Sequence, residues 1–123
     1  MMTECGYSGD DIFEERPWGY FQVVLDEPNV KIKKIGVKPK QRLSLQLHTG
    51  RSEWWKVIEG LGEVQKGNQI IQLGKFDTVD IDKYEVHRIE NVGDEYLVFV
   101  EIQTGVCNED DIIRIEDDYG RIE

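Results

Sequence analysis

Short runs of β-branched and aromatic residues follow one another along nearly the whole chain, and turn-forming residues separate them. The runs cover residues 20–25, 30–37, 43–48, 54–58, 63–65, 70–73, 78–81, 86–89 and 96–103. Such runs are typical of β-strands, and a pair such as Gly67-Asn68 between two runs is typical of a tight hairpin. No window carries the apolar period of about 3.6 residues that marks an amphipathic helix. Short strands at this spacing predict an all-β fold, a jelly roll or small barrel.

Two segments at the ends of the chain depart from this pattern. Residues 1–15 are largely polar and are expected to form a loosely held N-terminal arm, which leaves residues 16–123 as a single domain. Near the other end, within residues 108–116, three consecutive acidic residues precede two isoleucines. Because acidic residues favour the first turn of a helix, we predict a short C-terminal helix there.

The composition excludes several classes of protein. The 123 residues are 39% hydrophobic, too many for a disordered chain. No apolar run approaches the roughly 20 residues that a membrane span needs. A net charge of −10 argues against a nucleic-acid binder, which shows a basic surplus. The N-terminus lacks the basic region of a secretory signal, and Cys5 and Cys107 are too few for a disulfide framework. We therefore expect a cytoplasmic protein that contacts neither membranes nor nucleic acids.

The basic residues are unevenly distributed. The stretch between Pro28 and Ser52 has no acidic residue, yet it holds Lys31, Lys33, Lys34, Lys38, Lys40, Arg42 and Arg51. A basic segment inside an acidic protein attracts anions such as phosphate. The alternative is a solvated strand face whose charge is balanced by the acidic residues near the C-terminus.

Polar side chains alternate with leucines in residues 43–48. In a strand, this alternation puts the three leucines on one face and Gln46 and His48 on the other. Glu53 opens the next strand, and His87 lies on a later one. Together these four side chains offer two imidazoles, a carboxylate and an amide oxygen, a set that suits Zn²⁺, Co²⁺, Mn²⁺, Fe²⁺ or Ni²⁺. The alternative is a pair of ordinary surface or hydrogen-bonded histidines.

The order of these residues resembles the two cupin motifs: Gln46-x-His48-x-x-x-x-Glu53 followed by Gly60, then Gly74 and His87-x-x-x-Asn91. Further stretches resemble the type II phosphomannose isomerases: Arg16-Pro17-Trp18-Gly19-Tyr20, residues 37–48, Arg51-Ser52-Glu53-x-Trp55, and the closing residues 109–121 with Tyr119-Gly120-Arg121. In that family the cupin domain is the C-terminal part of a bifunctional isomerase and mannose-1-phosphate guanylyltransferase. The resemblance covers residues 16–121 and implies a cupin double-stranded β-helix, which is a jelly-roll barrel.

The resemblance also implies an activity, the interconversion of mannose 6-phosphate and fructose 6-phosphate through a metal-stabilised enediolate. The implied metal ligands are Gln46, His48, Glu53 and His87, with zinc as the first choice of metal and cobalt, manganese, iron or nickel as others. The catalytic candidates are Arg51 and Glu53, and the candidates for binding a sugar phosphate are Arg51, Trp55 and Arg121. Because the sequence has no glycine-rich nucleotide loop, we expect an isomerase without guanylyltransferase activity.

The sequence departs from that family beside the expected ligands. His48-Thr49-Gly50 stands where relatives carry three histidines, Trp54 replaces another histidine, Lys40 replaces a glycine, and Asp82-Lys83-Tyr84 replaces a Pro-x-Gly turn. These departures leave two alternatives open. One is a metal-independent isomerase or epimerase of a sugar nucleotide, with His48 or His87 as the base. The other is a non-catalytic cupin that binds a sugar phosphate.

The leucine face of residues 43–48 bears on assembly. If Gln46 and His48 line the barrel, then Leu43, Leu45 and Leu47 point outward and need cover. We therefore predict a homodimer.

Overall fold

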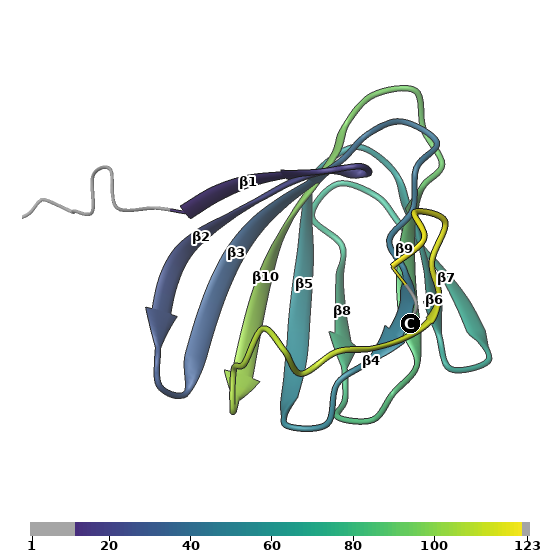
Figure 1. Cartoon of the computed structure of the whole chain (residues 1–123). Coiled ribbons are helices and arrows are strands. Elements are labelled where there is room, and N and C mark those ends of the chain that lie inside the picture. Colours follow the sequence, from purple (N-terminus) through teal and green to yellow (C-terminus); the bar gives the residue numbers. More distant parts are fainter. Residues whose placement is uncertain (1–11, 122–123) are drawn as a thin grey trace, which may run out of the picture.

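The computed structural model describes residues 12–121, which form two antiparallel β-sheets and no helix (Figure 1). The strands are β1 (Ile12–Arg16), β2 (Gly19–Glu27), β3 (Val30–Val37), β4 (Leu45–Leu47), β5 (Arg51–Glu59), β6 (Gly62–Lys66), β7 (Gln69–Leu73), β8 (Thr78–Ile81), β9 (His87–Asn91), β10 (Leu97–Gly105) and β11 (Ile113–Glu116). One sheet has six strands in the order β1-β2-β3-β10-β5-β8, and the other has five in the order β11-β4-β9-β6-β7. The all-β prediction is confirmed. Within the described residues, no helix is long and apolar enough to cross a membrane.

The hydrophobic core lies between the two sheets. The six-stranded sheet contributes fully buried side chains such as Val37, Val57 and Phe99, and the five-stranded sheet contributes Val64 and Ile89. These residues occupy alternate positions of their strands, so each strand buries one face against the opposite sheet. The hairpin predicted at Gly67-Asn68 joins β6 to β7 as expected.

The inner face of the six-stranded sheet changes from apolar to charged along three neighbouring strands. Strand β10 pairs with β3 on one side and with β5 on the other. Moving along these strands, the register aligns Ile35, Phe99 and Val57 in one row, Lys33, Glu101 and Trp55 in the next, and Lys31, Gln103 and Glu53 in the one after. Because alternate residues share a face, these three rows all point inward, and a polar site begins directly beside the core.

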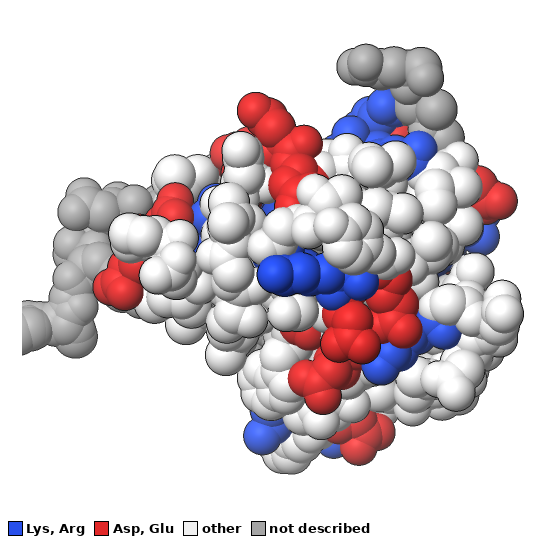
Figure 2. All heavy atoms as spheres, turned by 90° about the horizontal axis from the view of Figure 1, so that it is seen from below, with Lys and Arg blue, Asp and Glu red and all other residues white. Residues whose placement is uncertain are grey.

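The basic segment between β2 and β5 divides into two parts. Lys31 and Lys33 are buried on the inner face of β3, whereas Lys34, Lys38 and Lys40 are exposed. The two interpretations of this segment therefore apply to different lysines. On the face seen in Figure 2, Lys and Arg side chains lie beside Asp and Glu side chains near the centre.

The C-terminal segment (residues 106–121) contains a strand where we predicted a helix. Strand β11 pairs antiparallel with β4, and the segment crosses from the six-stranded to the five-stranded sheet, as the yellow trace in Figure 1 shows. The predicted helix at residues 108–116 is wrong because Asp111 does not cap its own segment. Its carboxylate instead accepts hydrogen bonds from the backbone N–H groups of Thr49 and Gly50, at 2.9 and 2.8 Å.

The N-terminal boundary also differs from the expected one. Residues 12–15, expected in the arm, form most of β1 and pair with β2, where the Phe13 ring stacks on Tyr20 with centroids 5.1 Å apart. The rest of the expected arm, residues 1–11, lies outside the described residues.

The leucine face is smaller than the alternation suggested. Leu45 is buried within the chain, and Leu43 packs against the hydrophobic core. Leu47 lies opposite Ile113 of β11, so the chain's own C-terminal segment pairs with the strand that we expected a second subunit to cover.

Candidate metal centre

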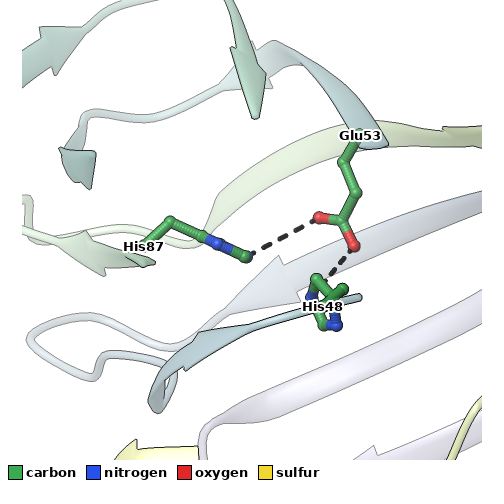
Figure 3. Close-up of side chains that lie close together, drawn as sticks. All are labelled: His48, Glu53 and His87. Atoms are coloured by element: carbon green, nitrogen blue, oxygen red, sulfur yellow. Dashed lines mark ion pairs between the residues drawn. The ribbon is translucent and has the colours of Figure 1, made fainter. Parts of the chain in front are cut away.

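Three buried side chains converge at the polar end of the inner face. His48 directly follows β4, Glu53 lies on β5, and His87 begins β9. One candidate ligand atom from each residue lies within 4.8 Å of the other two. The Glu53 carboxylate lies between the two imidazoles, with Oε2 at 3.2 Å from His48 Nε2 and Oε1 at 3.9 Å from His87 Nε2 (Figure 3). This group is able to hold a metal ion.

Backbone carbonyl groups fix which nitrogen of each histidine faces Glu53. His48 Nδ1 lies 2.6 Å from the carbonyl oxygen of Asp111, and His87 Nδ1 lies 2.8 Å from that of Glu85. A carbonyl oxygen only accepts hydrogen bonds, so each Nδ1 must carry the proton and donate it. In a neutral ring the lone pair is then on Nε2, the atom that faces the carboxylate.

Both rings are neutral at pH 7. Burial, followed by the nearby Arg51 guanidinium, lowers the pKa of His48 to about 4, and burial lowers the pKa of His87 as well. Two nitrogen lone pairs therefore face a carboxylate. Arg51 Nη2 lies 3.4 Å from His48 Nε2 and 2.8 Å from Glu53 Oε2, so these acceptors already attract one cationic group, and a metal ion would stabilise them further. Two imidazoles and one carboxylate are the ligand types that divalent zinc and its neighbours prefer.

Arg51 and Trp55 hold the Glu53 carboxylate in place. Arg51 Nε donates to Glu53 Oε2 at 2.9 Å, and the Trp55 indole N–H donates to Oε1 at 3.0 Å. Arg51 also donates to the carbonyl oxygen of Asn108 at 3.2 Å. The guanidinium that we expected to bind phosphate is therefore already engaged with the central carboxylate.

Glu101 is a second buried acid beside the centre, and our sequence reasoning missed it. Its Oε2 accepts from the Trp55 indole at 3.1 Å, and its Oε1 accepts from Gln103 Nε2 at 2.8 Å. Burial, with the charge of Glu53 as the next cause, raises the pKa of Glu101 to about 7. Alternation within residues 97–103 puts Glu101 and Gln103 on the strand face of Phe99, but only the register with β3 and β5 brings Glu101 to the centre.

A pH-dependent stability difference follows from Glu101. Between the unfolded pKa and the folded value of about 7, the folded protein binds this proton and the unfolded chain does not, so this group's stabilisation is lost as pH rises. At pH 8 we expect Glu101→Gln to be more stable than the wild type by up to about 3 kcal/mol, and the gap to close near pH 4.5. Urea unfolding of both metal-free proteins measures the difference. Taking the difference between the two proteins also removes the pH dependence of stability that His48 contributes to both, which has the opposite sign. A gap that does not change with pH would contradict the assignment.

The other predicted site residues lie in one cavity with the three converging side chains. Gln46 and Trp55 line it, and Gln46 Nε2 donates a 3.4 Å hydrogen bond to the Ser44 carbonyl oxygen rather than to the histidines. Arg121 also lines it, and its guanidinium donates two 2.8 Å hydrogen bonds to Asp117.

The cavity has a volume of about 140 Å³ and more basic than acidic residues in its lining. That volume holds far more than a single water molecule. The basic residues are Arg16, Lys33, Arg51, Arg114 and Arg121, and the acidic ones are Glu53, Glu101 and Glu109. In a chain of net charge −10, such a lining favours an anionic ligand.

Comparisons with known proteins agree on the family. The sequence profile described as "Mannose-6-phosphate isomerase C-terminal" matches residues 10–117. The xanthan biosynthesis protein XanB of Xanthomonas campestris is 39% identical over 107 residues, which are 86% of this chain and 23% of that protein. The mannose-1-phosphate guanylyltransferase ManC of Salmonella typhimurium is 35% identical over 108 residues, 87% of this chain and 22% of that protein. The chain thus spans less than a quarter of the length of these relatives.

Solved structures agree on the fold. A Klebsiella pneumoniae protein described as having a double-stranded β-helix domain matches with a TM-score of 0.69 and 22% identity, over 91% of this chain and 90% of that one. Oxalate decarboxylase from Lactobacillus farciminis matches with a TM-score of 0.76 and 20% identity, over 86% of this chain and 34% of that one. The fold is the cupin double-stranded β-helix, as the sequence motifs predicted.

The relatives' names correct our expectation about activity. We expected a stand-alone mannose-6-phosphate isomerase without guanylyltransferase activity. Proteins that match most of this chain are named as mannose-1-phosphate guanylyltransferases, and this chain corresponds to less than a quarter of each. The expectation is therefore wrong, because it rested on a missing nucleotide loop, and a chain that matches less than a quarter of each relative gives no ground for separating it from guanylyl transfer.

Proposed function

The chain belongs to the family of mannose-6-phosphate isomerase C-terminal domains, and from that membership we propose that it serves as the cupin part of a mannose-1-phosphate guanylyltransferase. XanB, named for xanthan biosynthesis, supports a role in making precursors of polysaccharides. Guanylyl transfer to a sugar phosphate draws on a nucleoside triphosphate, so we place the protein in the cytoplasm.

We propose that the cupin pocket holds a divalent metal ion, with zinc as the first choice. His48, Glu53 and His87 would bind it, and Gln46 in the same cavity is the candidate for a fourth ligand. The observation that carries this proposal is the pair of imidazole lone pairs aimed at one buried carboxylate. When bound, such an ion supplies a Lewis acid that polarises an oxygen of the ligand. Asp111 and Glu85 orient the two rings through their carbonyl oxygens.

We also propose that the ligand in the pocket is a phosphorylated sugar. The basic surplus of the lining favours an anion, and the buried Trp55 ring forms part of the wall. Mannose 1-phosphate, which the name of ManC carries, is the first candidate. Arg51 lines the cavity while its guanidinium donates to Glu53 and Asn108, so it contributes positive charge near the ion rather than free donors.

One experiment tests the role in guanylyl transfer. XanB without its C-terminal match would be assayed for GDP-mannose formation from GTP and mannose 1-phosphate, alone and with this chain added at equal concentration. We expect the added wild-type chain to raise the rate several-fold. The Glu53→Gln chain is expected to give no increase over truncated XanB alone. An equal rate with and without the wild-type chain would contradict the proposed role.

The predicted homodimer remains a proposal. Exposed apolar side chains lie on two edge strands, Ile12 and Phe13 on β1 and Ile113 on β11. Light scattering at micromolar concentration is the test, and a monomeric mass would contradict it.

A further inference from the structure

Two buried lysines share one carboxylate at the edge of the cavity. Lys31 Nζ lies 2.7 Å from Glu109 Oε2, and Lys33 Nζ lies 3.1 Å from Glu109 Oε1. The lysine side chains are only 6% and 9% exposed, whereas the Glu109 side chain is 52% exposed. The pairing joins β3 to the C-terminal segment, which are far apart in the sequence.

In the described part of the chain, the carboxylate hydrogen-bonded to both lysines is that of Glu109. A buried ammonium group requires a partner, and Glu109 supplies one negative charge for two lysines. Two further acids lie near them: Asp26, 3.8 Å from Lys31 and largely exposed, and Glu101, which is opposite Lys33 on β10 and has a pKa raised to about 7 by burial. Burial alone would raise the pKa of Glu109, but hydrogen bonds and charge from the two lysines lower it to about 2. A dianion would balance the two lysines better than one carboxylate does.

The Glu109 side chain can leave the lysines without detaching the C-terminal segment. It lies in a turn before β11, and its side chain makes ion pairs to the two lysines. The segment is held separately, two residues further on, by the hydrogen bonds of Asp111 to Thr49 and Gly50. Releasing the Glu109 side chain into water therefore leaves that anchor intact.

We propose that Lys31 and Lys33 form a phosphate-binding site, which Glu109 occupies as an internal stand-in until a ligand phosphate displaces it. Lys33 and Glu109 both line the cavity that contains the candidate metal ligands, so the phosphate of a sugar bound there would reach Lys33 and the Glu109 position that Lys31 shares. This inference rests on the proposed function for its sugar phosphate, and it adds the residues that hold the phosphate and the residue that competes with it.

The test is phosphate binding by metal-free protein. Isothermal titration calorimetry with inorganic phosphate would compare wild type, Glu109→Gln and Asp110→Asn. The neighbouring Asp110 is a matched control, because its substitution changes the net charge equally at an exposed residue, whereas the lysines pair with Glu109. We expect Glu109→Gln to bind phosphate roughly tenfold more tightly than both other proteins, because the competing carboxylate is gone. Equal affinity in all three proteins, or weaker binding by Glu109→Gln, would overturn the proposal.

Two further arms identify the site and its ligand. Adding Lys33→Met to Glu109→Gln should abolish the gain, and a thermal melt of the double variant checks that it is folded. Mannose 1-phosphate should show the same gain as inorganic phosphate, whereas mannose should show none; a gain with mannose would contradict a phosphate site. Zn²⁺ affinity is measured on the same proteins, so failure of the metal centre and failure of the phosphate site give different results.

Discussion

Replacing Arg51 with methionine is expected to destabilise the metal-free protein by about 3–5 kcal/mol, because removing one partner of a buried ion pair leaves the other charge without compensation. Glu53, whose side chain is 1% exposed, would lose its guanidinium partner, and the buried Glu101 would lose a nearby positive charge. Urea unfolding at pH 7.5 measures the change. Arg42→Met is the matched control, since Arg42 pairs with Asp118 at the surface and such pairs contribute ~0–1 kcal/mol.

Zn²⁺ should restore much of the stability lost in Arg51→Met. A metal ion at Glu53 supplies the positive charge that the methionine lacks, and a ligand that binds only the folded state stabilises it. The same unfolding measurement with and without Zn²⁺ tests this. If Arg51→Met lowered the free energy of unfolding as little as Arg42→Met does, Arg51 would not be the counter-charge of a buried acidic centre.

Glu53→Gln should weaken Zn²⁺ binding by about 100-fold or more, since a lost ligand costs more than the 10–100-fold typical of a lost outer partner. Glutamine keeps the shape of the side chain but removes the charge between the two imidazoles. Competition with a chromophoric chelator measures the affinity. Glu63→Gln is the control, because it makes the same change of charge on β6, where Glu63 accepts an exposed hydrogen bond from Gln72. Equal Zn²⁺ affinity in both variants would place the metal elsewhere.

The all-β fold was predictable because its evidence is local, whereas the cupin assignment came from the family resemblance. Turn residues such as Gly67-Asn68 and the β-branched runs between them mark strands whatever their partners are. The convergence of His48, Glu53 and His87 was predicted from a family resemblance and from alternation within residues 43–48. That alternation does not say which atoms meet; the orientation of both rings depends on the carbonyl oxygens of Asp111 and Glu85.

The features that the sequence did not reveal depend on register between distant strands. Glu101 joins the centre because β10 places it between Lys33 and Trp55, an alignment that no single strand contains. The helix predicted from three consecutive acids failed for the same reason. Glu109 pairs with lysines of β3 and Asp111 with the backbone before β5, so both acids serve tertiary contacts rather than a helix start.

The central claim is that His48, Glu53 and His87 form a metal centre, and direct titration of the EDTA-treated chain tests it. We predict saturable binding of one Zn²⁺ per chain at pH 7.5, and visible absorption bands when Co²⁺ is used instead, as expected for an ion with imidazole ligands in a protein site. Absence of saturable binding with Zn²⁺, Co²⁺, Mn²⁺, Fe²⁺ and Ni²⁺ would contradict the account. Arg51 would then be the only cation that the Glu53 carboxylate holds.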